Sequence, residues 1–220
     1  MLTAAIIQAR IGSSRLPRKT LLPLPTGRLV VQEVIHRCRQ IKGIDIVVAA
    51  IPESDFDLEQ AVRSYMRDNH GFPPVQLHLG PEHDVLKRYA DAAKLLKADI
   101  IMRITADCPL LDSRVCGDVL WQFLVDKVDY CSNVHPRTFP VGYDCEVFTS
   151  EALLAADAMA TAPYDREHVT SFIVTHPDCR QANIVSVDPL RRHIRWTLDD
   201  VDDYAIIYKE FQRRIAEGRA

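Results

Sequence analysis

Hydrophobic positions follow two alternating patterns along this chain. Short runs rich in Ile, Val and Ala predict buried strands, and longer stretches with apolar residues three or four positions apart predict amphipathic helices. In the first half, the runs predict strands at residues 3–8, 45–51, 75–79 and 99–105. The helical faces between them are formed by Val31, Val34, Ile35, Cys38 and Ile41, and by Val85, Leu86, Tyr89, Ala92, Ala93 and Leu96. This βαβαβαβ order is typical of a three-layer α/β/α fold in which helices cover both faces of a mainly parallel sheet.

The second half of the chain is less regular. Asp112 is a predicted N-cap for a helix whose apolar face includes Val115, Val119, Phe123 and Leu124. The later elements are predicted as strands at 129–132, 144–149 and 181–187, a loop at 135–140, and helices at 150–160, 165–175 and 201–217. Because the sequence contains no linker, repeat or low-complexity segment, we predict one domain over residues 1–220. An irregular insert at about 133–165 is expected to serve as a substrate lid or a dimer arm.

Length and composition narrow the class of protein. A chain of 220 residues with 47% hydrophobic positions fits an α/β domain and excludes disorder, collagen and coiled coil. No apolar run reaches the roughly 18 to 20 residues that span a bilayer, and the run 2–7 is too short for a signal peptide. We therefore expect a soluble, cytoplasmic protein with no membrane contact. The six cysteines lack C-x-x-C spacing, so buried free thiols are expected in place of a zinc site or disulfides.

Charge is distributed unevenly along the sequence. The net charge of −3 gives no indication of a nucleic-acid partner. The first 32 residues, however, carry five cations and no carboxylate, whereas the other 188 residues carry 22 cations and 30 carboxylates. The five cations are Arg10, Arg15, Arg18, Lys19 and Arg28. Four of them follow the first predicted strand within ten residues.

The segment at 9–19, Ala-Arg-Ile-Gly-Ser-Ser-Arg-Leu-Pro-Arg-Lys, is a candidate phosphate loop. Ligands of parallel sheets bind beyond the carboxyl ends of the strands. Gly12, Ser13 and Ser14 let backbone N–H groups approach an anion, and the neighbouring cations supply charge for a polyphosphate. Neither G-x-x-x-x-G-K-[ST] nor G-x-G-x-x-G is present. A solvated basic loop is the alternative, although four such cations repel one another unless an anion joins them.

The run Ile-Gln-Ala-Arg-x-Gly-Ser-Ser-Arg-Leu-Pro-x-Lys at 7–19 resembles the opening of the spore-coat-polysaccharide-type cytidylyltransferases, relatives of the enzymes that make CMP-Kdo and CMP-sialic acid. That family more often has Gly where this chain has Arg18. The segment Arg-Ile-Thr-Ala-Asp-Cys-Pro-Leu-Leu-Asp at 103–112 is similar to its R-I-T-G-D-C-P-L-I-D signature. Further similar segments follow in the family's order at 79–89, 129–133, 137–148, 166–170 and 196–204, the last without the family's Pro.

The resemblance implies a nucleotide-diphospho-sugar transferase-like fold and a CTP-dependent reaction. CMP would pass from CTP to an anionic small-molecule acceptor, with release of pyrophosphate and with Mg²⁺ as cofactor. The acceptor would be a nonulosonic or Kdo-like sugar acid, a sugar or alditol phosphate, or a small phosphonate, and the enzyme would be a homodimer. Two alternatives stay open: a nucleotidyltransferase of the same fold that uses another NTP, and a non-catalytic nucleotide-binding scaffold.

The resemblance also implies roles for individual residues. The predicted catalytic residues are Arg10, Arg15, Lys19 and Asp107. Asp107 and Asp199 are the predicted metal ligands, since Mg²⁺ prefers one or two carboxylates together with phosphate oxygens and water. Asp107 has the alternative role of capping a loop, and Asp199 that of favouring a helix N-terminus.

The remaining predicted contacts divide between nucleotide and acceptor. Nucleotide binding is assigned to Ala9, Gly12, Ser13, Ser14, Asp84, Arg88 and Arg103, and acceptor binding to Arg137, Asp144, Glu146, Arg166 and His168. His168 has the alternative of a structural hydrogen bond. Asp144 and Glu146 share one face of a predicted strand, so pairing with Arg137 is their alternative.

Overall fold

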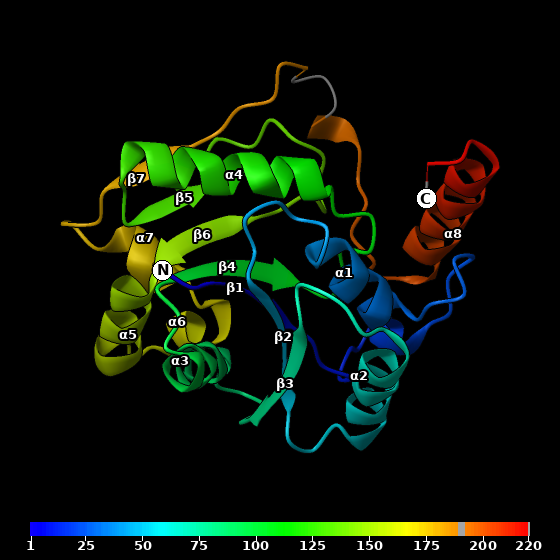
Figure 1. Cartoon of the computed structure of the whole chain (residues 1–220), viewed down its shortest axis with the longest axis horizontal. Helices are drawn as coiled ribbons and strands as arrows, with labels where there is room; N and C mark the ends of the chain where they lie inside the picture. The colour runs from blue at the N-terminus through cyan, green and yellow to red at the C-terminus, as the bar shows by residue number, and fades with distance from the viewer. Residues whose placement is uncertain (189–191, 220) are drawn as a thin grey trace.

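A seven-stranded sheet forms the centre of the structure, a computed structural model that describes residues 1–188 and 192–219 (Figure 1). The strands are β1 (Thr3–Gln8), β2 (Ile46–Pro52), β3 (Val75–Gly80), β4 (Ile100–Thr105), β5 (Tyr130–Ser132), β6 (Glu146–Thr149) and β7 (Gln181–Asn183). Their order across the sheet is β3-β2-β1-β4-β6-β5-β7. β6 runs antiparallel to both of its neighbours, and the other pairings in the described ranges are parallel.

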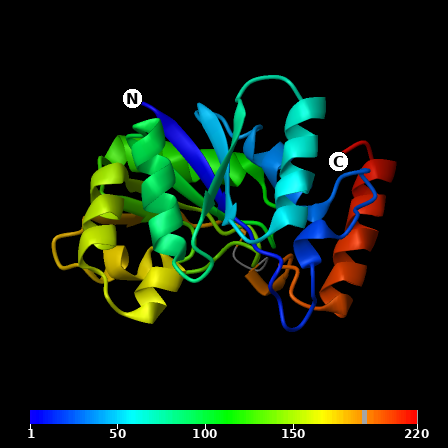
Figure 2. The same cartoon turned by 90° about the horizontal axis from the view of Figure 1, so that it is seen from below.

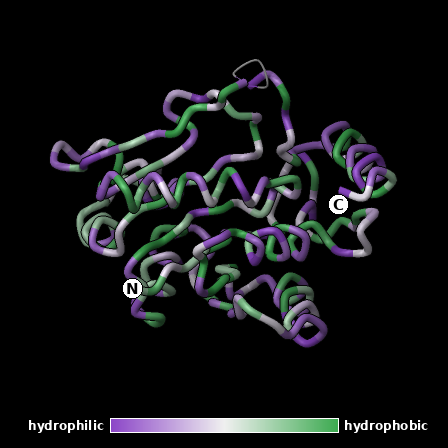
Figure 3. The backbone as a smooth tube through the Cα atoms, turned by 45° about the horizontal axis from the view of Figure 1, so that its top comes forward, coloured by the Kyte–Doolittle hydropathy of each residue, from purple (hydrophilic) through white to green (hydrophobic). Residues whose placement is uncertain are grey.

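Helices cover both faces of this sheet. They are α1 (Val30–Cys38), α2 (Phe56–Asp68), α3 (Val85–Leu96), α4 (Ser113–Asp126), α5 (Ser150–Met159), α6 (Pro163–His168), α7 (Ser171–Thr175) and α8 (Val201–Ala216), with a short 3₁₀ helix η1 (Lys19–Leu21). One face packs on α1, α2 and α4 through Ala5 and Ile7, and the other packs on α3, α5 and α7 through Ala4 and Ile6. Hydrophobic residues therefore concentrate in the central strands, whereas hydrophobic and hydrophilic residues alternate along the helices (Figure 3). The predicted three-layer α/β/α fold with a mixed sheet is confirmed.

Helix ends follow the capping chemistry of the sequence. The Asp112 carboxylate accepts the N–H groups of Arg114 and Val115, which confirms the predicted N-cap of α4. Asp200 caps α8 in the same way. A smaller core of Leu24, Val30, Leu110, Leu198, Ile207 and Phe211 holds α8 against the segment that follows β1. Helix α8 accordingly lies beside that segment at one side of the molecule (Figure 2).

Two predicted elements differ from the structure. The helix predicted at 165–175 is two helices, because the buried Val169 adopts φ +62° and ends α6. This tight turn is closed by a hydrogen bond from the Thr170 N–H to the His168 carbonyl at 2.6 Å. The strand predicted at 181–187 ends at Asn183; beyond it, the Ser186 N–H bonds the Thr138 hydroxyl instead of a neighbouring strand. Within the predicted insert, regular structure resumes at β6.

The cysteine side chains lie mostly in the interior. All six cysteines are free, and all but Cys179 are buried. Burial raises the pKa of the Cys131 thiol to about 11, which keeps that group protonated near neutral pH. Within residues 1–188 and 192–219, no helix is long and apolar enough to cross a membrane.

A buried ion pair crosses the sheet between β4 and β6. Arg103 and Glu146 are directly paired in register, and the Arg103 guanidinium donates to Glu146 Oε2. Glu146 Oε1 accepts the Tyr130 hydroxyl at 2.6 Å. Burial raises the pKa of Glu146, but Arg103 and Tyr130 outweigh it, so the pKa lies below its ordinary value. The pair thus supplies charge compensation inside the sheet.

We predict that Glu146→Gln lowers the free energy of unfolding at neutral pH by about 3 kcal/mol, because Arg103 is left buried without its counter-charge. A carboxylate with a lowered folded-state pKa stabilises the protein fully above its unfolded pKa, ordinarily 4.5, and loses that contribution as pH falls below it. Wild-type stability should therefore fall more steeply than variant stability below that pH. Urea unfolding across pH measures both effects.

Asp91→Asn is the matched control, because Asp91 pairs with Lys87 at the surface. Surface pairs contribute little to stability, so we expect a much smaller loss. Equal losses in the two variants would contradict the role given to the buried pair.

Candidate active site

Three segments that are distant in the sequence meet beyond the carboxyl ends of β1 and β4. They are the loop after β1, the loop after β4 and the residues that precede α8. The Leu198 N–H donates to the Asp107 carbonyl at 2.8 Å, which fixes the third segment against the second. Asp107 and Asp199 consequently lie side by side although 92 positions separate them.

Lys19 lies between these two aspartates. Its Nζ is 3.1 Å from Asp107 Oδ2, 3.0 Å from Asp199 Oδ1 and 2.7 Å from the Leu198 carbonyl oxygen. An ammonium group has three N–H donors, so these three acceptors use all of them. The Lys19 side chain is only 14% exposed. The site therefore brings together three of the residues that the sequence assigned to catalysis and metal binding.

The backbone of Arg18 directs Lys19 inward. Arg18 adopts φ +60°, in the left-handed region that favours glycine. The turn sends the Arg18 guanidinium outward to Asp57 at 2.8 Å and starts η1 at Lys19. This conformation gives a physical reason for the glycine that the resembled family more often carries at this position.

Asp199 is surrounded by cations. Oδ1 accepts Lys19 and also contacts Arg15 at 3.1 Å, while Oδ2 accepts the guanidinium of Arg195. Burial raises the pKa of Asp199, but these three cations outweigh it and hold the pKa below its usual range. The carboxylate is therefore ionised at neutral pH.

Arg195 was missed by sequence reasoning. It contacts both Asp199 and Asp203, but the segment at 195–199 is not helical, so the four-residue spacing gave no signal of a contact. Its place depends on Gly142, where an added Cβ would lie 2.7 Å from the Trp196 carbonyl carbon. A hydrogen bond from the Trp196 N–H to the Val141 carbonyl, at 2.7 Å, joins the two segments where they approach closely.

The loop after β1 has the free backbone donors that an anion site needs. Asp55 Oδ2 accepts the Ile11 N–H at 2.7 Å and anchors the start of the loop. The Ser13 hydroxyl oxygen accepts the Leu16 N–H at 3.4 Å. Among the residues that the structure describes, no partner is found for the backbone N–H groups of Gly12, Ser13, Ser14 and Arg15. Asp55 is a second residue that sequence reasoning missed, although its place just after β2 was a usable signal.

Arg10 extends to the opposite wall of the site. Its guanidinium is 3.6 Å from Glu167 of α6, and both side chains are about half exposed. The next residue, His168, is exposed, and its ring centroid lies 4.2 Å from that of Tyr164. Helix α6 therefore presents the Glu167 carboxylate to Arg10, and its exposed Tyr164 and His168 rings pack against each other.

Other predicted site residues contact one another instead of open space. Arg166 donates to both oxygens of Asp84, at 2.9 and 2.7 Å, and joins α6 to the N-terminus of α3. Arg137 pairs with both oxygens of Asp144, at 2.5 and 2.6 Å, so the structure has the ion pair that was the alternative to acceptor binding by Asp144. Glu146, for which the same pairing with Arg137 was the alternative, instead pairs with Arg103.

Arg88 is fully buried and shapes the loop after β3. Its Nη1 donates to the Glu82 carbonyl at 2.9 Å and also to the Pro81 carbonyl. Its Nε has no hydrogen-bond partner within the described part of the chain. Burial lowers the pKa of this guanidinium. Arg88 thus acts on the loop backbone and does not extend into solvent.

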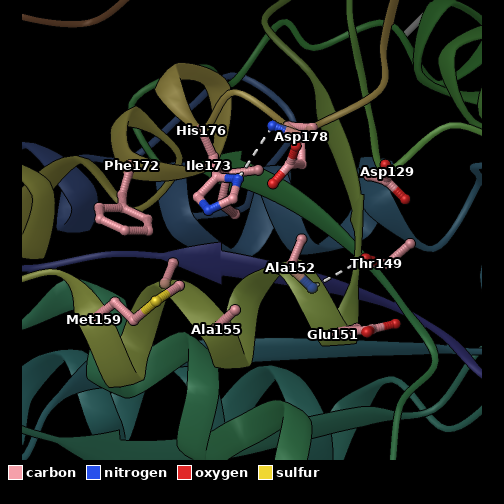
Figure 4. Close-up of a pocket in the computed structure, with 12 residues that line it drawn as sticks. Asp129, Thr149, Glu151, Ala152, Ala155, Met159, Phe172, Ile173, His176 and Asp178 are labelled. Atoms are coloured by element: carbon pink, nitrogen blue, oxygen red, sulfur yellow. Dashed lines mark hydrogen bonds between the residues drawn. The ribbon is translucent and has the colours of Figure 1, made fainter.

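Two hollows of the surface lie apart from this site. One, of about 250 Å³, is enclosed by Ala152, Ala155 and Met159 of α5 facing Phe172 and Ile173 of α7, as Figure 4 shows. Its walls are mainly apolar and it contains none of the predicted site residues. The other, of about 870 Å³, lies between α1, the start of α4 and the end of α8, and its arginines are mostly paired. Neither contains the residues of the Lys19 cluster.

The Lys19 cluster fits a hard divalent cation. Asp107, Asp199 and the Leu198 carbonyl offer oxygen atoms, the donors that Mg²⁺ prefers. No group of three or more His, Cys, Asp or Glu side chains suited to a metal occurs within the described ranges. A cation held by the two aspartates would therefore complete its shell with water and phosphate oxygens.

The fold and this site together define a nucleotidyltransferase: a covered mixed sheet whose first loop is basic, rich in free N–H groups and opposed by two aspartates. The family model described as Cytidylyltransferase matches residues 4–217. The chain belongs to the cytidylyltransferase family and is a nucleotidyltransferase of that class.

Relatives along nearly the whole chain agree with this family. An uncharacterized protein of Methanocaldococcus jannaschii is 33% identical over 94% of this chain and 82% of its own length. The spore coat polysaccharide biosynthesis protein SpsF of Bacillus subtilis is 31% identical over 94% of this chain and 85% of its own. A cytidylyltransferase structure from Leptospira borgpetersenii superposes with a TM-score of 0.84 at 27% identity, covering 99% of this chain and 95% of the other.

We predict that Arg18→Gly raises the free energy of unfolding by about 0.5 kcal/mol. The substitution relieves the cost of a side chain in the left-handed region, which exceeds the added chain entropy of glycine and a weak surface ion pair. Arg18→Ala, which loses the ion pair and keeps the Cβ, should be less stable than both wild type and Arg18→Gly. Urea unfolding of the three proteins decides the order, and equal stabilities for Gly and Ala would disprove the strain.

Proposed function

We propose that the protein transfers CMP from CTP to an anionic small-molecule acceptor and releases pyrophosphate. The observation that carries this proposal is the cluster of Lys19, Asp107 and Asp199 opposite the basic loop. A scaffold that only binds a nucleotide has no need of two adjacent carboxylates beside the phosphate-binding cations. Those carboxylates repel the phosphates unless a metal ion lies between the two groups.

The triphosphate would lie along the loop after β1. Arg10, Arg15 and Lys19 hold its β- and γ-phosphates, and the free N–H groups of Gly12, Ser13 and Ser14 approach its oxygens. The half-exposed Arg10 exchanges Glu167 for phosphate at low cost, because a surface ion pair contributes little. Catalysis then depends mainly on positioning and on fixed charge, as is usual for phosphoryl-type transfer.

Asp107 and Asp199 would hold Mg²⁺. When bound, the ion neutralises negative charge on the α-phosphate and on the leaving pyrophosphate. Arg195 orients Asp199 by donating to its second oxygen.

The reaction is an in-line displacement at the α-phosphorus. An acceptor oxygen forms a bond to phosphorus while the bond from phosphorus to the bridging oxygen of pyrophosphate breaks. A carboxylate or phosphate oxygen attacks in its ionised form. A hydroxyl needs a base, and Asp107, 27% exposed, is the candidate for that proton.

The acceptor is proposed to be a sugar acid or a sugar or alditol phosphate for surface polysaccharide. The name of the Bacillus subtilis relative supports a place in surface polysaccharide synthesis. The exposed His168 and Tyr164 on α6 are available to an anionic acceptor, whereas Arg137 in the loop before β6 would first have to give up its pairing with Asp144. We further propose a cytoplasmic homodimer in which the loop at 133–145 closes over the acceptor or contacts the partner.

We predict that Asp107→Asn lowers the rate of pyrophosphate release from CTP, Mg²⁺ and an accepted acid or phosphate by at least about a hundredfold, because a neutral amide replaces a charged metal ligand. Asp118→Asn, an exposed change on α4, should leave the rate unchanged. A coupled pyrophosphate assay on the two variants measures this. Wild-type turnover in Asp107→Asn would remove Asp107 from the metal site.

The donor is tested by thermal shift with CTP, UTP, GTP and dTTP, each with and without Mg²⁺. CTP with Mg²⁺ should raise the melting temperature by several degrees, since saturation at a hundredfold excess over Kd adds about 2.7 kcal/mol. A larger shift with another NTP would replace CTP as the donor. The absence of any shift would contradict nucleotide binding itself. Where CTP binds, mass spectrometry of the CMP adduct identifies the acceptor among candidate acids and phosphates, and a lack of any adduct would favour the non-catalytic scaffold.

A further inference from the structure

As the structure places it, Lys19 cannot bind a phosphate without first giving up a partner. All three of its N–H donors are used, by Asp107, Asp199 and the Leu198 carbonyl. The side chains of both aspartates are largely covered, at 27% and 16% exposure. Two such carboxylates repel each other unless a cation lies between them, and the ammonium meets that need.

The same oxygens form the cation site of the proposed function. Carboxylate and carbonyl oxygens are ligands for an ammonium group and for a hard divalent ion alike. The two cations cannot share them, because charges a few ångströms apart in a part-buried site repel strongly. Lys19 and a divalent ion are therefore competitors for Asp107 and Asp199.

We propose that the Lys19 ammonium occupies the metal position of the nucleotide-free enzyme, so that the metal enters only together with the triphosphate, as the metal–nucleotide complex. This inference rests on the proposed function and names the form in which its donor substrate binds. Free metal alone must displace a fully bonded ammonium that then has no new partner. A metal–nucleotide complex supplies the divalent ion for the aspartates and phosphate oxygens for Lys19 in one step.

The position of Lys19 makes this exchange short. It lies at the start of η1, directly after the loop whose N–H groups are free for an anion. Its flexible stem can move the ammonium from the aspartates to that loop without moving the backbone. Arg15, 64% exposed and also on Asp199, can follow the same path.

The proposal is tested by measuring Mn²⁺ binding to the protein without nucleotide. The loss of the electron paramagnetic resonance signal of free Mn²⁺ reports the amount bound. Lys19→Met removes the ammonium and keeps most of the stem. We expect it to bind Mn²⁺ at least about tenfold more tightly than wild type. Adding Asp199→Asn to Lys19→Met should abolish the gain. Unchanged or weaker binding in Lys19→Met would overturn the proposal.

Arg18→Met is the matched control, because it removes one positive charge from the adjacent position but leaves the aspartates and their partners in place. It should bind Mn²⁺ as weakly as wild type. An equal gain in both variants would show a general effect of net charge and would also overturn the proposal.

Folding of Lys19→Met adds a second readout. Its melting temperature should be below wild type in metal-free buffer and should rise more with Mn²⁺ than that of wild type, since the ion replaces the ammonium. If the variant does not fold at all, Lys19→Gln, which keeps a neutral donor, takes its place with the same expected gain. Equal Mn²⁺ shifts in wild type and variant would contradict the competition.

Failure of the proposed function is seen separately. Calorimetry of wild type with a CTP analogue that has a methylene bridge between the α- and β-phosphorus measures nucleotide binding with and without Mn²⁺. No binding in either condition would overturn the proposed function. Mn²⁺ should tighten binding of the analogue, and by linkage the analogue should tighten binding of Mn²⁺. If wild type binds Mn²⁺ equally well with and without the analogue, the competition between Lys19 and the metal is overturned while the proposed function stands.

Discussion

Charge compensation between two aspartates is the constraint on which the site depends. Asp107 follows the central strand β4 and Asp199 directly precedes α8, and the hydrogen bond from the Leu198 N–H to the Asp107 carbonyl fixes the two segments next to each other. Covered carboxylates at such a distance are stable only with a cation between them, and Lys19 supplies it. Lys19 therefore links the loop after β1 to the loop after β4 and to the start of α8, and the cation that lies between the two aspartates decides the state of the site.

The other charged residues of the region divide by burial. Arg103 and Glu146 are fixed inside the sheet, and Arg88 is fixed on the loop after β3, so these side chains shape the walls. Arg10 is about half exposed and Arg15 is 64% exposed. The exposed Glu167 that pairs with Arg10 is a weak competitor for a polyphosphate, whereas Arg15 pairs with the covered Asp199. Rigid walls and exchangeable cations together suit a reaction in which positioning and fixed charge supply most of the rate.

Much of the fold was predictable because the spacing of apolar residues along the chain shows which positions of each strand and helix are buried. β1, β4 and α3 lie within a residue of their predicted bounds. The break at Val169 was not predictable, because a β-branched residue rarely takes a positive φ and does so here where its side chain is buried. Arg166 shows the same limit for the site: its partner Asp84 is 82 positions away, and pairing at that separation leaves no local pattern.

Fold class, family and the residue types available for chemistry can be read from the chain, because strand and helix periods and collinear motifs are properties of local sequence. Which cation meets which carboxylate depends on the folded structure. Lys19 and Arg18 are adjacent cations in sequence, yet a left-handed turn sends one to the aspartates and the other to Asp57. Ion pairing depends on distances of a few ångströms, and those distances exist only after the sheet brings the loops together.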